Sequence, residues 1–339
     1  MEIHNSLEYI NKKVKEIKPS LRYNYELDFS IWQKQAKFKL EELLGLPFEK
    51  CDDMFSIISK KEEEEYTKID FEFQSEKDYF VVASLLVPNN FTKPLPVSIC
   101  LQGHSTGMHI TLGENIFEGD DDLIAGGRDF AIRAVKEGFC AVAVDQRYMG
   151  ASGRNDKGSP SCISENSAMA SLLLGRCAIG ERVWDIKRLI DVICAYFGEY
   201  VDTEKIICMG NSGGGTTTFY ASCLDERIHL SIPSCAVCTY EESIMAMYHC
   251  PCNFVPGIRK YFDMGDIGAL IAPRKLIVVC GKNDPVFPIT GVKKSFELIK
   301  NVYKMLEKED ICTLVEGDGG HQFYPDNVWP VVLEYLSKN

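Results

Sequence analysis

Apolar residues in the first part of the chain recur at the spacing of an amphipathic helix. The positions in this series are Leu7, Ile10, Val14 and Ile17. Pro19 ends the series, and a second helical stretch is predicted over residues 30–44, where Gly45 stops it. We therefore expect an N-terminal helical extension, which we place at residues 1–65.

From residue 66 onward the pattern changes to short runs typical of strands. These runs lie at residues 66–73, 80–87, 97–101, 139–144, 206–209, 228–232, 276–280 and 312–315. The first two read as antiparallel strands, whereas several of the later ones are wholly apolar, as in a sheet buried on both faces. Helical stretches fill most gaps from the third run on, at residues 123–136, 168–197, 215–224 and 292–306. This alternation predicts an α/β fold over residues 66–339, with a mostly parallel eight-stranded sheet and helices on both faces.

Three polar stretches interrupt this pattern. Residues 60–65 are all charged, which predicts a solvated loop or edge. Residues 105–122 and 148–166 are long insertions rich in Gly, Ser, Asp and Asn. Loops of that length in a compact domain are usually functional or mobile.

The most informative chemical pattern is the glycine-rich stretch Gly210-Asn211-Ser212-Gly213-Gly214. A predicted strand precedes it and a predicted helix follows it, the setting in which a nucleophilic serine lies on a sharp turn. The glycines suit such a turn because side chains two residues either side of Ser212 would collide with the backbone. The helix start also aims N–H groups near the serine, which favours a developing anion. The alternatives are an ordinary tight turn or a phosphate-binding loop, but the Lys-Ser/Thr pair of the latter is missing.

A serine hydroxyl needs a base to become a nucleophile. In this type of fold the acid and then the histidine follow the serine along the chain. Asp284 follows the run 276–280 and His321 follows the run 312–315, so both belong to the sheet edge that carries Ser212. We predict that His321 takes the Ser212 proton and that Asp284 orients the imidazole. The alternatives are a turn-capping Asp284 and a solvent-facing His321.

The same chemistry needs two backbone donors for the oxyanion. One is expected to be the N–H of Gly213, the residue after the nucleophile. The other should come from the loop after the third predicted strand, where Gly103 allows a close approach and His104 offers its N–H. The predicted oxyanion hole is therefore formed by His104 and Gly213.

Composition and charge narrow the class of protein. Hydrophobic residues make up 45% and charged residues 25% of the 339 residues, an ordinary globular composition. The net charge of -12 argues against a nucleic-acid partner, which requires a basic face. The sequence shows neither a signal-peptide pattern nor an apolar run long enough to span a bilayer. We expect a cytoplasmic protein that acts on a small molecule without a membrane partner, and a homo-oligomer remains open.

The chain contains 14 cysteines, which raises the question of disulfides and metals. Without a secretory signal, we expect reduced thiols that serve mainly as small core residues. A zinc ligand set is suggested by Cys235, Cys238, Cys250 and Cys252, with His249 adjacent. The second pair is spaced too tightly for a usual zinc knuckle, so we predict no metal and no cofactor.

Several short stretches together resemble a known superfamily. They are Asp145-Gln146-Arg147, Trp184-Asp185-Ile186-Lys187-Arg188, Gly210-Asn211-Ser212-Gly213-Gly214, His249-Cys250-Pro251-Cys252-Asn253, Tyr261-Phe262-Asp263-Met264, Ile271-Ala272-Pro273-Arg274, Asp284-Pro285-Val286-Phe287-Pro288 and Gly320-His321-Gln322-Phe323-Tyr324. In this order they are similar to the α/β-hydrolase superfamily, in particular its bacterial acetyl-xylan-esterase-like or dienelactone-hydrolase-like group. The resemblance covers about residues 66–336 and implies the α/β-hydrolase fold, with Ser212, Asp284 and His321 as the triad. The Cys250-Pro251-Cys252 stretch belongs to the pattern of this group.

The resemblance to carbohydrate deacetylases related to cephalosporin C deacetylase is partial. That family carries an Arg-Gly-Gln motif, a glutamine after the nucleophile and a His-Glu pair. This chain has Arg147-Tyr148-Met149, Gly213 and His321-Gln322 at those places.

The predicted function is a serine esterase that hydrolyses a small carboxylic ester, with an acetyl ester of a carbohydrate as one candidate. Two alternatives remain at this point. One is a peptidase or amidase on the same fold, which shares the triad. The other is a biosynthetic enzyme of this fold that catalyses a non-hydrolytic reaction.

Overall fold

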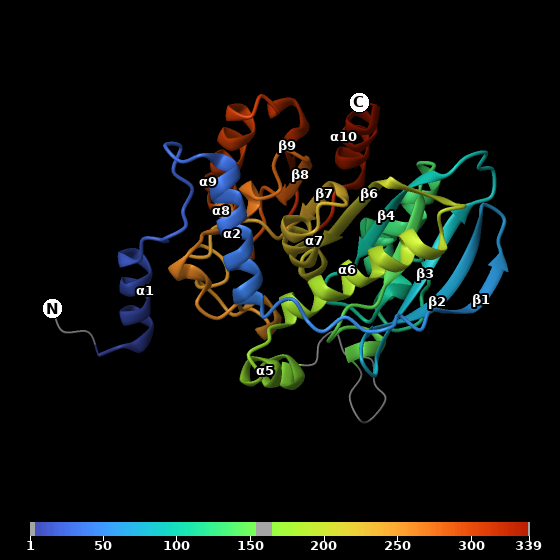
Figure 1. Ribbon diagram of the computed structural model, residues 1–339, viewed down its shortest axis with the longest axis horizontal. Coiled ribbons are helices and arrows are strands. Elements are labelled where there is room, and N and C mark those ends of the chain that lie inside the picture. Colours follow the sequence, from blue (N-terminus) through green and yellow to red (C-terminus); the bar gives the residue numbers. More distant parts are fainter. Residues whose placement is uncertain (1–3, 154–164, 338–339) are drawn as a thin grey trace.

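The computed structural model describes residues 4–153 and 165–337, and nine strands in this part of the chain form one sheet in the order β1-β2-β3-β5-β4-β6-β7-β8-β9 (Figure 1). The strands are β1 (Ser56–Glu62), β2 (Tyr66–Glu76), β3 (Tyr79–Pro88), β4 (Leu95–Leu101), β5 (Cys140–Val144), β6 (Val201–Asn211), β7 (Ile228–Ser234), β8 (Lys275–Gly281) and β9 (Cys312–Gly317). The pairs from β1 to β3, and β3 with β5, are antiparallel. All pairs from β5 across to β9 are parallel. The predicted mostly parallel sheet is thus confirmed.

Helices connect most of these strands. They are α1 (Ser6–Glu16), α2 (Phe29–Leu44), α3 (Asp120–Leu123), α4 (Phe130–Lys136), α5 (Glu165–Leu173), α6 (Ala178–Tyr196), α7 (Gly213–Leu224), α8 (Met264–Ala269), α9 (Ile289–Met305) and α10 (Pro325–Ser337). Short 3-10 turns lie at Met108–Ile110, Ala151–Gly153, Pro251–Asn253, Ile258–Lys260 and Glu309–Ile311, and a π-turn at Ile124–Arg128. No helix among the described residues is long and apolar enough to cross a membrane.

The predicted count of eight strands was wrong by one. The eight predicted runs correspond to β2 through β9, and β1 is the additional strand. Every residue of β1 is exposed, and it pairs only with β2 at the edge of the sheet. An edge strand held by main-chain hydrogen bonds needs no apolar pattern, and charged residues protect it from pairing with other chains. The first charged residues of the run, from Lys60 to Glu62, therefore form the last part of the edge strand β1.

Different helices pack against the two faces of the sheet. Along β4, Val97, Ile99 and Leu101 belong to one apolar cluster, whereas Cys100 belongs to the other. The first cluster includes buried residues of α2, α6, α7, α8 and α9, and the second includes those of α4 and α10. This period of two along the strands explains why uniformly apolar runs form the middle of the sheet.

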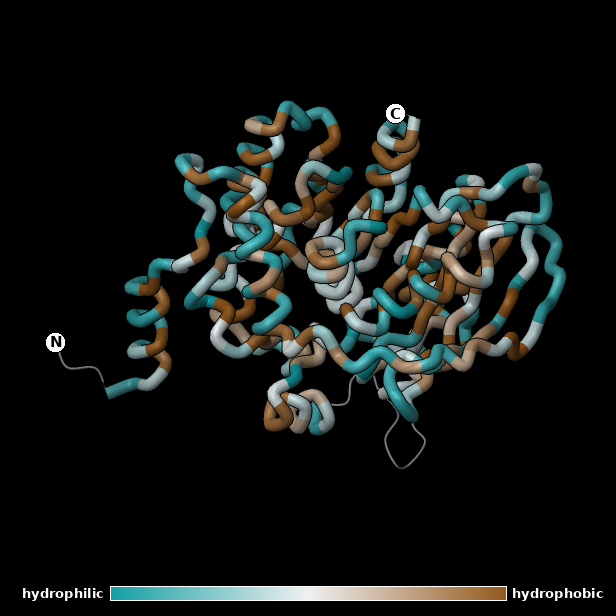
Figure 2. Tube along the Cα trace, in the orientation of Figure 1, coloured by the Kyte–Doolittle hydropathy of each residue, from teal (hydrophilic) through white to brown (hydrophobic). Residues whose placement is uncertain are grey.

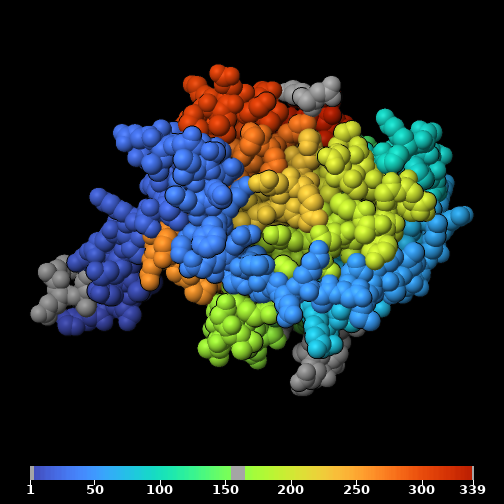
Figure 3. All heavy atoms as spheres, in the orientation of Figure 1, coloured from blue at the N-terminus to red at the C-terminus, as the bar shows by residue number. Residues whose placement is uncertain are grey.

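The N-terminal segment lies across one face of the molecule. Figure 3 shows it in blue, spread over the yellow and orange elements. In α2, the residues Trp32, Ala36, Leu40 and Leu44 are buried in the larger cluster. By contrast, α1 projects from the body and mixes hydrophobic and hydrophilic residues around its turns, with Val14 as its buried residue (Figure 2). The first 65 residues thus hold two helices and β1, and the domain boundary at residue 65 stays a prediction.

The buried carboxylate of Asp120 holds the first predicted insertion, residues 105–122, in place by hydrogen bonds. Asp120 accepts hydrogen bonds from Thr106 Oγ1 (2.5 Å) and from the N–H groups of Ile116 (3.1 Å) and Phe117 (2.8 Å). His109 Nε2 lies 2.7 Å from the same carboxylate. The second predicted insertion falls largely on residues 154–164, which lie outside the described residues.

A buried ion pair fastens the end of β5 to α6. Arg147 binds Asp185 through two hydrogen bonds of 2.7 and 2.8 Å, and both side chains are buried. Arg147 also lies 2.6 Å from a Glu76 oxygen. Asp185 and Arg188 are three positions apart on α6, a spacing that allows an ion pair, but Arg188 binds Asp191 instead. Spacing along a helix cannot reveal a partner such as Arg147, which comes from the loop after β5.

We expect Asp185→Asn to destabilise the protein by about 3 kcal/mol, because it leaves the buried Arg147 guanidinium without its main partner. Urea unfolding followed by circular dichroism measures this change. The control is Asp318→Asn, which removes the exposed pair with Lys282 and should cost less than about 1 kcal/mol. Equal effects of the two substitutions would contradict the role assigned to the buried pair.

Candidate active site

Ser212 lies in the turn between β6 and α7 with φ 56° and ψ -120°. A positive φ is costly for a residue with a side chain and is typical of strained functional turns. The glycines around it are required by space. A Cβ on Gly214 would lie 2.1 Å from the Leu101 oxygen, and one on Gly210 would lie 2.6 Å from the Gly214 carbonyl. The structure therefore has the sharp strand–turn–helix geometry that the sequence predicted.

Asp284 and His321 lie together at the ends of β8 and β9. The Nδ1 atom of His321 is 2.8 Å from an Asp284 carboxylate oxygen. The other oxygen accepts the N–H groups of Val286 (2.8 Å) and Phe287 (3.1 Å). Burial by itself raises the pKa of the Asp284 carboxyl, but His321 and the two N–H groups outweigh it, so this pKa lies below its ordinary value. Asp284 is thus held as a carboxylate facing the ring, which leaves Nε2 of His321 available for proton transfer.

Ser212 and His321 line the same cavity, of about 320 Å³. The other residues of its lining are His104, Glu165, Gly213, Tyr248, His249, Cys250, Asn253, Val286 and Phe287. Within the described residues the Ser212 hydroxyl makes no hydrogen bond to the His321 ring. Such bonds are often loose before a substrate binds. The structure thus brings all three predicted triad residues to one site, with Asp284 behind the ring.

The two predicted oxyanion donors lie side by side in this cavity. A Cβ on Gly213 would come within 3.1 Å of the His104 ring. In the part of the chain that the structure describes, neither the His104 N–H nor the Gly213 N–H has a hydrogen-bond acceptor. Gln146 Nε2 donates to the Gln102 carbonyl (2.6 Å) and so holds the loop before His104. Both N–H groups are therefore available to a ligand.

Sequence reasoning missed the aromatic wall of the cavity. The ring of Phe287 stacks on His321 with centroids 5.9 Å apart, and His249 meets Phe287 edge-on at 5.7 Å. Burial lowers the pKa of His249, and the nearby His321 lowers it further, so His249 stays neutral near pH 7. The position of Phe287, three residues after Asp284, could have indicated from the sequence that it lies near the site. For His249 the only indication in the sequence was that it precedes Cys250.

The four cysteines considered as zinc ligands are not assembled. Cys235 Sγ donates to the Gln322 carbonyl and Cys238 Sγ to the Pro288 carbonyl, away from the other pair. Cys250 and Cys252 instead lie next to His104, whose Nε2 is 3.2 Å from the Cys252 sulfur. The thirteen cysteines within the described residues are all free thiols.

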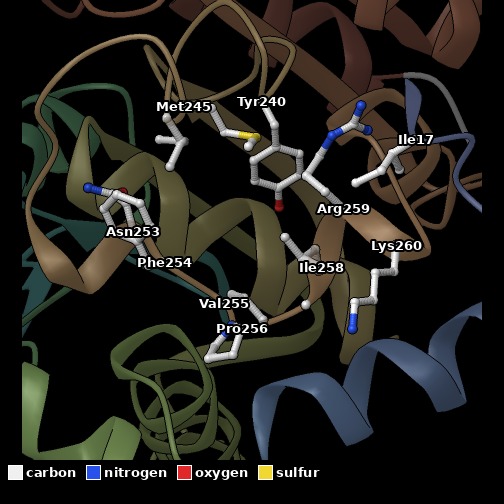
Figure 4. A pocket seen from close by; sticks show the side chains of 12 residues that line it. Ile17, Tyr240, Met245, Asn253, Phe254, Val255, Pro256, Ile258, Arg259 and Lys260 are labelled. Carbon is white, nitrogen blue, oxygen red and sulfur yellow. The ribbon is translucent and has the colours of Figure 1, made fainter. Parts of the chain in front are cut away.

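A second cavity, of about 460 Å³, lies next to the first (Figure 4). Asn253 lines both cavities. In Figure 4, Asn253 and Phe254 lie on one side of it and Ile17 and Lys260 on the other, with Tyr240 between them. This cavity holds none of the predicted triad residues, so we assign no chemistry to it.

Comparison with known proteins shows the family to which this chain belongs. A family model described as "Abhydrolase family" matches residues 4–316. The Bacillus subtilis (strain 168) protein named "Putative hydrolase YtaP" is 26% identical over 242 residues, which cover 69% of this chain and 77% of that protein.

Solved structures show the same fold at low identity. A "putative acetyl xylan esterase" from Bacteroides fragilis NCTC 9343 superposes with a TM-score of 0.80 at 18% identity, covering 99% of this chain and 95% of the other. A glucuronoyl esterase from Solibacter usitatus superposes with a TM-score of 0.70 at 14% identity, covering 95% and 98%. The expected resemblance is thus confirmed, and the chain belongs to the Abhydrolase family of α/β-hydrolase-fold enzymes.

Proposed function

We propose that this hydrolase is a serine esterase in which Ser212, His321 and Asp284 cleave a small carboxylic ester by acyl transfer. The observation that carries the proposal is the hydrogen bond between Asp284 and His321, whose ring faces the cavity that holds Ser212 on its strained turn. A base held in this way beside an exposed hydroxyl is the arrangement that nucleophilic catalysis needs.

In the first half of the reaction the Ser212 oxygen attacks the ester carbonyl. His321 Nε2 takes the serine proton, and the buried Asp284 carboxylate stabilises the resulting imidazolium. The carbonyl oxygen becomes an oxyanion, which the N–H groups of His104 and Gly213 stabilise by hydrogen bonds. The tetrahedral intermediate then collapses, and the alcohol leaves with the proton from His321.

In the second half a water molecule attacks the acyl-serine. His321 again takes a proton, this time from the water, and returns it to the Ser212 oxygen as the acyl bond breaks. The products are a carboxylic acid and the free enzyme. Each step uses only groups that line the cavity or lie directly behind it.

The cavity suits a neutral and polar alcohol. Its described lining contains one carboxylate, Glu165, and no lysine or arginine, so it favours an ester without a negative charge near the scissile bond. Tyr248, with 80% of its surface exposed, donates a 2.5 Å hydrogen bond to Glu165 at the rim. An exposed aromatic ring beside polar groups is a common way to hold a sugar. An acetyl ester of a carbohydrate is therefore our candidate substrate. This choice agrees with the name of the putative acetyl xylan esterase, whereas the glucuronoyl esterase is named for an ester of a sugar acid.

The cellular setting that we propose is the cytoplasm. The described cysteines are all free, as expected in a reducing compartment. In that setting the substrate would be a small ester or an imported oligosaccharide, since a polymer could not reach the enzyme.

We expect Ser212→Ala to lower kcat/KM for p-nitrophenyl acetate by about 10⁴-fold or more, because it removes the hydroxyl that forms the acyl-enzyme. The assay is release of p-nitrophenolate, with unfolding temperature as the check on folding. The control is Ser295→Ala, a buried serine whose hydroxyl donates to the Cys238 carbonyl and which does not belong to the cavity lining. Retention of wild-type turnover by Ser212→Ala would exclude Ser212 as nucleophile.

We expect Asp284→Asn to lower kcat at pH 7 by about 10³- to 10⁴-fold, because the histidine loses the group that fixes its tautomer. Stability should change with pH as well. Since the pKa of Asp284 is lower in the folded protein than in the unfolded chain, its carboxylate stabilises the fold above about pH 4, and this contribution is lost as the pH falls through the folded-state pKa.

Unfolding by urea tests this pH dependence. The gap in unfolding free energy between wild type and Asp284→Asn should be constant from about pH 8 to about pH 5 and shrink below about pH 4. A gap that narrows between pH 8 and pH 6 instead would show that another group is responsible.

A panel of esters tests the proposed substrate class. Acetylated monosaccharides and short oligosaccharides should be cleaved with higher kcat/KM than the methyl ester of glucuronic acid. An acetyl ester places only a two-carbon acyl group beside Ser212 in the cavity of about 320 Å³, whereas the glucuronate ester places its sugar ring on the acyl side. The reverse preference would reject the acetyl-sugar candidate while leaving the serine mechanism in place.

A further inference from the structure

We propose that His104, Cys250 and Cys252 form a binding site for a soft divalent cation, Zn²⁺ in particular, in the wall of the active-site cavity. One ligand atom from each of the three residues lies within 4.8 Å of the others. The His104 Nε2 atom is 3.2 Å from the Cys252 sulfur, and the sulfurs of Cys250 and Cys252 are 2.9 Å apart. These three side chains converge on one point although His104 and Cys252 are 148 positions apart in the chain.

The donor set fits zinc chemistry. Two cysteine sulfurs and one imidazole nitrogen make a Cys₂His set, and sites with three protein ligands keep a fourth position open for water or another ligand. Bonds of about 2.3 Å to sulfur and about 2.0 Å to nitrogen place tetrahedral donors about 3.6–3.8 Å apart. The two measured pairs, His104 with Cys252 and Cys250 with Cys252, therefore need to separate by less than about 1 Å to admit the ion.

Two separate elements hold the ligands in place. His104 belongs to the loop after β4, which Gln146 fixes through the Gln102 carbonyl. Cys250 and Cys252 flank the start of the 3-10 turn at Pro251–Asn253, where the Cys252 N–H donates to the Cys250 sulfur at 3.1 Å. A site assembled on such rigid parts loses little freedom when an ion binds.

Access is through the active-site cavity. His104 and Cys250 belong to its lining, whereas Cys252 is buried with 1% of its surface exposed. An ion would thus enter past Cys250, and its open position would face the space that Ser212 also faces.

This position links the ion to hydrolysis, and the link rests on the proposed function. The His104 ring lies against Gly213, one residue after the nucleophile. An ion there would hold His104, whose N–H is a proposed oxyanion donor, and would fill part of the cavity beside Ser212. We therefore infer that Zn²⁺ inhibits ester cleavage.

The experiment must distinguish this site from a second set of potential metal ligands. Cys235, Asp284 and His321 also offer ligand atoms within 4.8 Å of one another, and two of them belong to the proposed triad. Zinc at that place would inhibit as well. Cys235 therefore provides a matched control, because its removal weakens the second set and leaves His104, Cys250 and Cys252 intact.

Direct metal binding is the primary test, since it does not depend on activity. The full chain is reduced with a phosphine, freed of metal, and titrated with Co²⁺ and then with Zn²⁺ against a chromogenic chelator. Wild type and Cys235→Ser should bind one equivalent and show the thiolate-to-cobalt charge-transfer absorption. Cys250→Ser and Cys252→Ser should each bind at least about 10-fold more weakly and lose most of this absorption.

Two results would overturn the site: equal affinity in wild type, Cys250→Ser and Cys252→Ser, or loss of binding in Cys235→Ser alone. Circular dichroism and unfolding temperature check each variant. Because Cys252 is buried and its replacement risks misfolding, the partly exposed Cys250 provides the variant on which the test depends.

A second experiment measures inhibition of ester cleavage. It compares, between wild type and the variants, the Zn²⁺ concentration that halves the rate of p-nitrophenyl acetate cleavage, with each protein normalised to its own rate in EDTA. Cys250→Ser should need at least about 10-fold more Zn²⁺ than wild type, and Cys235→Ser about the same as wild type. A shift confined to Cys235→Ser would place the inhibitory ion at the triad and refute the inference. If wild type cleaves no ester at all, the proposed function fails, and the cobalt titration still decides the metal site.

Discussion

The active site depends on the close approach of two backbone segments, the turn between β6 and α7 and the end of β4. Ser212 adopts a left-handed backbone conformation there, and the Leu101 carbonyl at the end of β4 lies against Gly214. This contact fixes Ser212, the proposed nucleophile, and the loop that carries His104 with respect to each other. Any side chain on Gly210 or Gly214 would push the two strands apart, so the backbone sets the geometry of the proposed reaction.

Around that turn, each partner of Ser212 comes from a different strand end. The carboxyl ends of parallel strands share one edge of the sheet, which brings Asp284 and His321 to the serine although they follow it by many positions. The antiparallel strands β1 to β3 add no member to this site and extend the sheet away from it. The N-terminal helix α2 covers the face packed with α6 and α7 and so supports the turn from behind.

Much of this arrangement could be predicted from sequence, because strands buried on both faces are uniformly apolar and the order of serine, acid and histidine follows the order of the strands. The edge strand β1 was missed because it buries no side chain. The Arg147–Asp185 pair and the cluster of His104 with Cys250 and Cys252 were missed for a different reason. Each joins residues that only the folded chain brings together, so no local spacing reports them.

The central claim is that Ser212 is the acylated nucleophile. Its most direct test is to treat the full chain with a fluorophosphonate and to locate the adduct by peptide mass spectrometry. We expect one adduct per chain, on Ser212, and its loss after His321→Ala because the base is gone. An adduct on any other residue, or labelling that is independent of His321, would exclude Ser212 as a nucleophile activated by His321.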